Sequence, residues 1–256
     1  YGMNMLPPAI ALFSSILKSR GHQVELFDAT YYQTDHGVDS DGTKMDNLNV
    51  VPYDMGERGI KMRTSHWRDD IREQVKRFSP DLIAMSSTED MWELGLSLLE
   101  SVGTYIVKNK IPVLVGGVFA TFAPHLAIKH PLVKAVCVGE GENALVDICE
   151  CIERGKDYST VTNLWVKKDG SILRNTISRP VDINSNPNID VSLFEEARLY
   201  RPMSGNVYRM LPVETIRGCP YKCAFCNSPN QVELYKKETG DNFLRKKRMD
   251  LVYQEL

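Results

Sequence analysis

Hydrophobic residues along the chain follow two alternating spacings. In four stretches they recur every three to four positions, which predicts amphipathic helices. In four others they form short apolar runs or, over 23–27, alternate with polar residues, which predicts strands. The helical stretches are 9–17, 67–78, 94–106 and 143–154, and the strand runs are 23–27, 82–85, 111–115 and 134–138. Helices alternating with mostly apolar strands indicate an α/β fold with a mostly parallel sheet that is covered on both faces.

The beginning of this pattern is irregular in two ways. A helix precedes the first strand, which is unusual for an α/β sheet, so we expect an earlier strand ahead of residue 1. Residues 31–65 are polar and aperiodic, and we interpret them as an inserted loop. Within it, Asp39-Ser40-Asp41-Gly42 is similar to part of a calcium loop, but Gly37 stands where the first aspartate is required, which excludes that reading.

Small residues follow three of the predicted strands. Ligands of parallel α/β sheets bind beyond the carboxyl ends of the strands, and glycine there lets the backbone approach a flat or phosphate-bearing ligand closely. The alternative is that these glycines only turn the chain, and both interpretations stay open. The candidate cofactor-binding residues are Ser86, Ser87 and Thr88, then Gly116 and Gly117, then Gly139, Glu140 and Gly141.

The pattern changes after residue 155. Asp169-Gly170 separates two short apolar runs and predicts a β-hairpin. Residues 179–201 are rich in Pro, Asn and Asp, as in a linker, and a strand at 212–216 leads into a group of cysteines. We therefore expect a domain over residues 1–155, a linker with a hairpin over 156–211, and the beginning of a second domain over 212–256.

Composition and charge narrow the class of protein. The chain is 43% hydrophobic and 25% charged, as ordinary globular proteins are, and its net charge of −2 gives no general attraction to nucleic acid or anionic lipid. The basic run 245–248 is interpreted as a solvated helix start. No apolar run has the length and continuity of a membrane span. We expect a cytoplasmic protein without a nucleic-acid or membrane partner.

Three cysteines lie within eight residues, at Cys219, Cys223 and Cys226. Thiolates at this density suit iron–sulfur clusters or zinc, but structural zinc sites normally have four ligands in paired units. This chain has no second cysteine pair, and no histidine follows His130. Three thiolates would leave one iron of a four-iron cluster without a protein ligand. The remaining cysteines, at 137, 149 and 151, are interpreted as packing residues, with a second cluster as the alternative.

The spacing Cys-x-x-x-Cys-x-x-Cys after a predicted strand resembles the radical S-adenosylmethionine superfamily. The resemblance implies that the open iron of a four-iron four-sulfur cluster binds the amino and carboxylate groups of S-adenosylmethionine. One electron from the cluster then cleaves that molecule to methionine and a 5′-deoxyadenosyl radical. It also implies that Phe225, just before the third cysteine, lies beside the adenine.

A wider set of motifs is similar to the cobalamin-binding branch of that superfamily. These motifs are Arg217 to Cys223, Pro80-Asp81-Leu82-Ile83, Gly116-Gly117 with Ala120-Thr121, Gly139-Glu140-Gly141-Glu142 and Pro187-Asn188-Ile189-Asp190. The branch implies a Rossmann-like cobalamin-binding domain followed by the start of a partial (β/α) TIM barrel. A full barrel takes about 200 residues, and 30 residues follow Cys226, so we expect a fragment of a longer enzyme.

Two departures from the branch concern the cobalt ligand. No histidine has an aspartate two residues before it, so we expect no histidine on the lower face of cobalt. Phe119 stands where relatives often carry histidine, and its ring could cover the corrin or mark a domain that has lost cobalamin.

The resemblance implies an enzyme, a cobalamin-dependent methyltransferase acting on an unactivated centre of a small-molecule or natural-product substrate. It would receive electrons from a reductant protein such as flavodoxin or ferredoxin. Ring formation and rearrangement fit the same residues. The alternatives are a cobalamin-free radical enzyme with a vestigial Rossmann-like domain, and a non-catalytic cobalamin- or metal-binding module.

Overall fold

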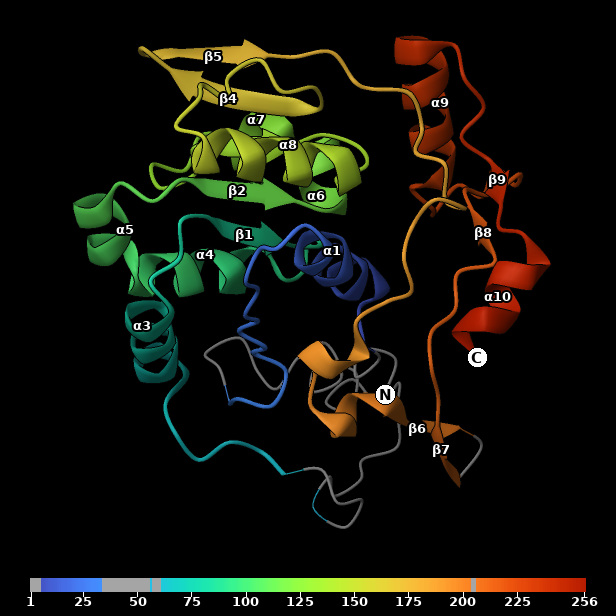
Figure 1. Ribbon diagram of the computed structural model, residues 1–256, viewed down its shortest axis with the longest axis horizontal. Helices are drawn as coiled ribbons and strands as arrows, with labels where there is room; N and C mark the ends of the chain where they lie inside the picture. The colour runs from blue at the N-terminus through green and yellow to red at the C-terminus, as the bar shows by residue number, and fades with distance from the viewer. Residues whose placement is uncertain (1–5, 34–55, 57–60, 204–205) are drawn as a thin grey trace.

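A five-stranded sheet organises the first two thirds of the chain (Figure 1). The computed structural model describes residues 6–33, 56, 61–203 and 206–256. The strand order is β1-β2-β3-β4-β5, with β1, β2 and β3 parallel and the last two strands antiparallel to their neighbours. The strands are β1 Ile83–Ser86, β2 Val113–Gly116, β3 Ala135–Cys137, β4 Leu164–Lys168 and β5 Ser171–Arg174.

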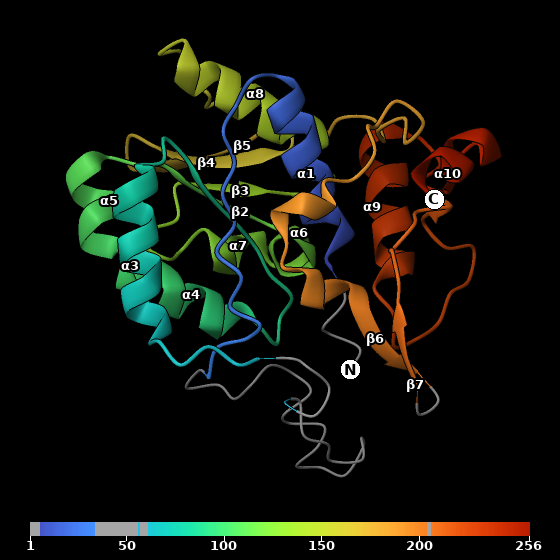
Figure 2. The same ribbon diagram turned by 60° about the horizontal axis from the view of Figure 1, so that its bottom comes forward.

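Helices cover both faces of the sheet, as the apolar strands predict (Figure 2). On one face lie α1 Pro8–Ser19 and α8 Glu142–Glu153. The other face carries α3 Trp67–Phe78, α4 Trp92–Ser101, α5 Gly103–Asn109, α6 Val118–Phe122 and α7 Pro124–Ala127. Because side chains alternate across a strand, Val113 and Val115 of β2 enter the core under α3 to α7, whereas Leu114 enters the core under α1 and α8.

Two predicted elements differ in the structure. Residues 23–27 are extended but pair with no strand among the described residues. They run instead beside α3, where the side-chain amide of Gln74 donates to the Leu26 carbonyl at 3.1 Å and Arg77 pairs with Glu25 at 2.8 Å. The helix predicted over 94–106 is divided in two at Val102, whose N–H donates to the Leu99 carbonyl at 3.2 Å.

The predicted hairpin is confirmed, and it belongs to the sheet rather than to a separate linker. Asp169 and Gly170 form its turn with φ values of 47° and 76°, the left-handed pair that two-residue hairpins favour. Since β4 pairs with β3, the sheet continues to residue 174, beyond the predicted boundary at 155. Most of the predicted inserted loop at 31–65, including Asp39-Ser40-Asp41-Gly42, lies outside the described residues.

The last third of the chain runs along the carboxyl ends of the strands (Figure 1). It contains the 3-10 turns Val191–Leu193 and Glu196–Leu199, the hairpin β6 Tyr200–Met203 with β7 Asn206–Arg209, and the elements β8 Ile216–Arg217, α9 Ser228–Thr239, β9 Arg245–Lys246 and α10 Met249–Glu255. The strands β8 and β9 form one short antiparallel pair. The partial barrel therefore stays a prediction. Among the described residues, no helix combines the length and hydrophobicity needed to cross a membrane.

Candidate functional site

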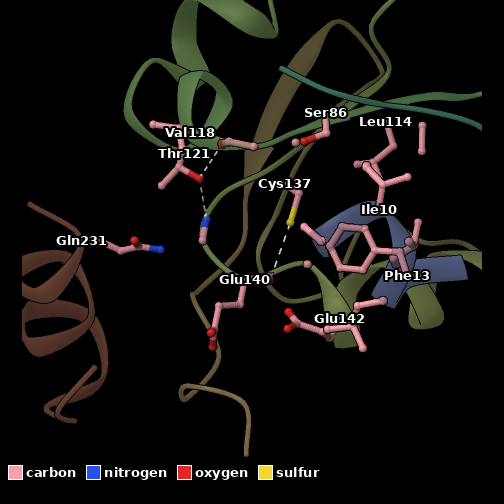
Figure 3. A pocket seen from close by; sticks show the side chains of 18 of the residues that line it. Ile10, Phe13, Ser86, Leu114, Val118, Thr121, Cys137, Glu140, Glu142 and Gln231 are labelled. Atoms are coloured by element: carbon pink, nitrogen blue, oxygen red, sulfur yellow. Dashed lines mark hydrogen bonds between the residues drawn. The ribbon is translucent and has the colours of Figure 1, made fainter. Parts of the chain in front are cut away.

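A cavity of about 300 Å³ opens where β1, β2 and β3 end, between α1 and α9. Figure 3 shows Ile10 and Phe13 of α1 beside Leu114 of β2 on its apolar side. Glu140 and Glu142 lie on another side. The three predicted small-residue loops all contribute to the lining, so the structure brings them together at one edge of the sheet.

The loops after β1 and β2 are in direct contact. Ser86 is exposed and lines the cavity, whereas Ser87 is buried and its N–H donates to the Gly116 carbonyl at 3.2 Å. Thr88 is exposed and points its hydroxyl to Asp90. Gly117 has a φ of 94°, and a Cβ there would lie 2.7 Å from the Ser87 carbonyl oxygen. This glycine is therefore required by the close approach of the two loops.

Gly116 is different, because within the described part of the chain an added Cβ would meet only the Cys137 Cβ, at 3.8 Å. A side chain at position 116 therefore fits the backbone and reaches the cavity that Gly116 lines. The glycine pair thus has one structural member and one member open to a ligand.

Thr121 of α6 joins the loops that follow β2 and β3. Its hydroxyl donates to the Gly117 carbonyl at 2.9 Å and accepts from the Gly139 N–H at 3.2 Å. Figure 3 shows this side chain at the cavity. Thr121 was not among the predicted site residues, although the Ala120-Thr121 motif after the double glycine marks its position.

Glu140 is buried, and its carboxylate already has four donors from the protein. It accepts from the Val181 N–H at 2.7 Å, from Arg217 at 2.7 Å and from Arg245 at 2.6 and 2.9 Å. Burial alone would raise the pKa of Glu140, but the hydrogen bonds from Arg245 and Arg217 outweigh it and lower that pKa. The sequence predicts Glu140 as a cofactor-binding residue. In the structure its carboxylate accepts hydrogen bonds from Arg217 and Arg245.

Arg217 lies two residues before the first cysteine of the motif and is mostly buried. Besides Glu140 it donates to Glu142, and to both carboxylate oxygens of Glu214 at 2.7 and 3.0 Å. Burial would lower the pKa of Arg217, but these carboxylates raise it, so the guanidinium stays charged. The segment that carries the cysteines is thus tied to the loop after β3.

The cysteine loop itself faces solvent. Cys219 is half-buried, Cys223 and Cys226 are exposed, and Phe225 is 94% exposed. Within the described part of the chain, no three His, Cys, Asp or Glu side chains gather as a metal site. The donors fit an iron–sulfur cluster by chemistry, as accessible soft thiolates on one short loop, but the loop as it stands does not hold the three sulfurs together.

The other cysteines are confirmed as packing residues. Cys137 is buried, and Cys149 and Cys151 pack against the core under α1 and α8. Burial raises the pKa of Cys137 to about 12 and that of Cys149 to about 11, which keeps both as thiols. Phe119 is also a core residue, with its ring 4.5 Å from that of Trp92.

Comparison with known proteins shows which families and structures the chain resembles. Residues 48–149 match the B12 binding domain family. The chain is 26% identical over 163 residues to an uncharacterized methyltransferase of Pyrococcus horikoshii, covering 63% of this chain and 34% of that protein. It is also 26% identical over 168 residues to the anaerobic magnesium-protoporphyrin IX monomethyl ester cyclase of Rubrivivax gelatinosus, covering 62% of this chain and 29% of that protein.

Two solved structures share the fold at low identity. The radical S-adenosylmethionine methyltransferase TsrM from Kitasatospora setae gives a TM-score of 0.56 at 16% identity, over 98% of this chain and 42% of TsrM. The cobalamin-dependent radical enzyme OxsB gives 0.62 at 18% identity, over 93% of this chain and 30% of OxsB. The chain thus spans about a third of the length of the curated relatives that it matches.

Fold, cavity and comparisons together define a protein with a B12-binding domain. More particularly, the chain is similar in sequence to a methyltransferase and to an ester cyclase, and it shares its fold with TsrM and OxsB.

Proposed function

We propose that the chain is the cobalamin-binding part of a radical S-adenosylmethionine methyltransferase, together with the segment that holds its iron–sulfur cluster. The observation that carries the proposal is the ion pair between Arg217 and Glu140, at 2.7 Å. It ties the start of the cysteine loop to the end of β3, where the cavity lies. Both candidate cofactor sites are therefore at the same edge of the sheet.

Cobalamin would bind at the rim of this cavity. The cavity, of about 300 Å³, is smaller than a corrin, so it would take only a part of the cofactor. Gly116 and Ser86 offer backbone and hydroxyl groups there, and Ile10 and Phe13 offer apolar contact. Phe119 packs against Trp92 instead of lining the cavity, so its ring would not cover the corrin there.

Cys219, Cys223 and Cys226 would hold a four-iron four-sulfur cluster, and Phe225 would shield the adenine of S-adenosylmethionine. When bound, these groups supply a 5′-deoxyadenosyl radical, and cobalamin supplies a methyl group. The residues of this chain would position the two cofactors relative to each other. An external reductant protein and a small-molecule substrate complete the proposed system.

Anaerobic reconstitution of the chain with iron, sulfide and hydroxocobalamin tests the proposal. We expect about four irons per chain, bound corrinoid, and a visible spectrum without histidine coordinated to cobalt. Alanine at Cys219, Cys223 or Cys226 should lower the iron content, whereas the matched control Cys151→Ala should keep it.

Each of three possible results would contradict a different part of the proposal. Stoichiometric zinc instead of iron would favour a non-catalytic metal-binding module. Iron without corrinoid would favour the cobalamin-free radical enzyme. Full iron content in all three cysteine variants would remove the cluster assignment.

A further inference from the structure

The contacts of Glu140 extend beyond the two arginines to α9 and to the chain just before β4. Its N–H donates to the Tyr235 hydroxyl of α9 at 2.7 Å, and its carbonyl accepts from the Asn163 side chain at 2.9 Å. Tyr235 is fully buried and stacks on Phe243, with ring centroids 4.6 Å apart. Glu140, at the end of β3, therefore contacts Tyr235 of α9, Arg245 of β9 and Arg217 at the start of the cysteine loop.

Gly218 restrains the same loop through its backbone. It has a φ of 93°, and a Cβ at this position would lie 2.9 Å from the Phe243 carbonyl oxygen. Arg217 just before it is fixed by Glu140, Glu142 and Glu214. The chain is thus held on two sides immediately before Cys219.

The charges of this group are buried and unequal. Glu140 and Glu142 have side chains 6% exposed, and Arg245 and Arg217 are 16% and 19% exposed. Counting Glu214, three carboxylates face two guanidinium groups. Breaking a buried pair leaves an uncompensated charge and is much more costly than breaking a surface pair, so this group resists separation of the loop from the sheet.

We propose that Glu140 is a positioning residue that, through Arg217 and Arg245, fixes the cysteine loop over the cavity at the ends of β2 and β3. The inference rests on the proposed function only in taking that loop as the cluster site. The sequence predicts Glu140, between Gly139 and Gly141, as a cofactor contact. In this inference Glu140 instead aligns the two cofactor sites.

A distance measurement between spin labels tests the inference without any cofactor. One label is attached to Cys223, which is exposed, and the other to a cysteine introduced by Val107→Cys on α5, where Val107 is 67% exposed. Cys149, Cys151, Cys219 and Cys226 are replaced by serine, and the buried Cys137 is retained. We expect one narrow distance distribution in this background.

Glu140→Gln removes the charge with little change of shape and should broaden the distribution about twofold, because the arginines lose their shared partner. Glu140→Asp keeps the charge and should restore part of the narrow distribution. The matched control Arg179→Gln breaks an exposed bidentate pair with Asp241, at 2.7 and 2.9 Å, and should leave the distribution unchanged. Circular dichroism establishes that each variant is folded.

A folded Glu140→Gln variant with the original narrow distribution would overturn the inference, and so would a broad distribution in the unsubstituted background. If Glu140→Gln does not fold, Arg245→Gln takes its place, because it leaves the pair with Arg217 intact. Loss of iron or corrinoid binding in the reconstitution experiment would refute the proposed function and leave these distances unaffected, so the two failures are distinguishable.

Discussion

The hydroxyl of Tyr235 accepts a 2.7 Å hydrogen bond from the backbone N–H of Glu140, 95 positions earlier in the chain. Both residues are buried, and the ring of Tyr235 occupies the space that a side chain at Gly139 would need, since a Cβ there would lie 2.6 Å from its hydroxyl oxygen. Gly139 therefore permits a contact between the sheet and α9.

Replacing Tyr235 by phenylalanine should lower the free energy of unfolding by about 1–3 kcal/mol, because the Glu140 N–H loses its acceptor inside the protein. Urea unfolding followed by circular dichroism measures this difference. Tyr253→Phe is the control, since that side chain is 71% exposed and its change should have little effect. Equal stability of Tyr235→Phe and the parent protein would show that the N–H finds another acceptor.

The two glycines after β2 should respond differently to valine. Gly117→Val should destabilise the fold by about 1–3 kcal/mol, because the backbone is left-handed there and the Ser87 carbonyl is too close. Gly116→Val should keep the stability and weaken corrinoid binding by filling the cavity. Thermal unfolding and equilibrium dialysis with hydroxocobalamin measure the two effects. Unchanged corrinoid affinity in Gly116→Val would place the ligand elsewhere.

Asp190 should make the fold depend on pH in the acid range. Burial would raise its pKa, but hydrogen bonds from Lys18, Ser14 and Ser192 lower it from 3.8 to about 2. A carboxyl whose pKa is lower in the folded state stabilises the fold above its unfolded pKa. That stability is fully present above about pH 4 and is lost as the pH falls through about 2.

Asp190→Asn should therefore cost about 1–2 kcal/mol at pH 7 and flatten the dependence of stability on pH between about 4 and 2. Urea unfolding at a series of pH values measures this slope. Asp69→Asn, in which the original side chain is 75% exposed, is the control and should keep the slope of the parent. A parental slope in Asp190→Asn would assign the acid sensitivity to other carboxyls.

Three of the six cysteines should differ in how fast they react with a thiol reagent. Cys223 and Cys226 are exposed and should be modified within the folded apo protein, whereas Cys137 should react only after unfolding because burial raises its pKa to about 12. Peptide mass spectrometry after short exposure to iodoacetamide at pH 8 measures this order. Fast modification of Cys137 in folded protein would contradict its place in the core.

The local hydrophobic pattern predicted individual helices and strands better than it predicted which strands pair. The apolar run at β2 correctly indicated a strand buried on both faces, because Val113 and Leu114 enter opposite cores. Residues 23–27 alternate polar and apolar side chains, which also predicts a strand, but they form none, since strand formation needs a partner strand and here the neighbours are side chains of α3. The local pattern of a segment does not determine whether another strand pairs with it.

The candidate site also has features that the local sequence predicts and features that depend on residues far apart in the chain. Small residues at strand ends correctly located the cavity, because their position follows from the order of the strands. The role of Glu140 could not be predicted from its motif, since Arg217 and Arg245 lie 77 and 105 positions further along the chain. The cysteine spacing indicated soft metal ligands, but the conformation of their loop does not follow from spacing alone.

The backbone conformation of Gly218 has a consequence for the entropy of metal binding. A loop that must collect three sulfurs around an ion loses conformational freedom, and the loss is smaller when one end is already immobile. Gly218, in contact with the chain at Phe243, fixes the direction in which the loop leaves β8. Replacing Gly218 by alanine would therefore increase the conformational freedom of the cysteine loop in the metal-free protein. We expect this change to weaken iron binding although all three cysteine ligands remain.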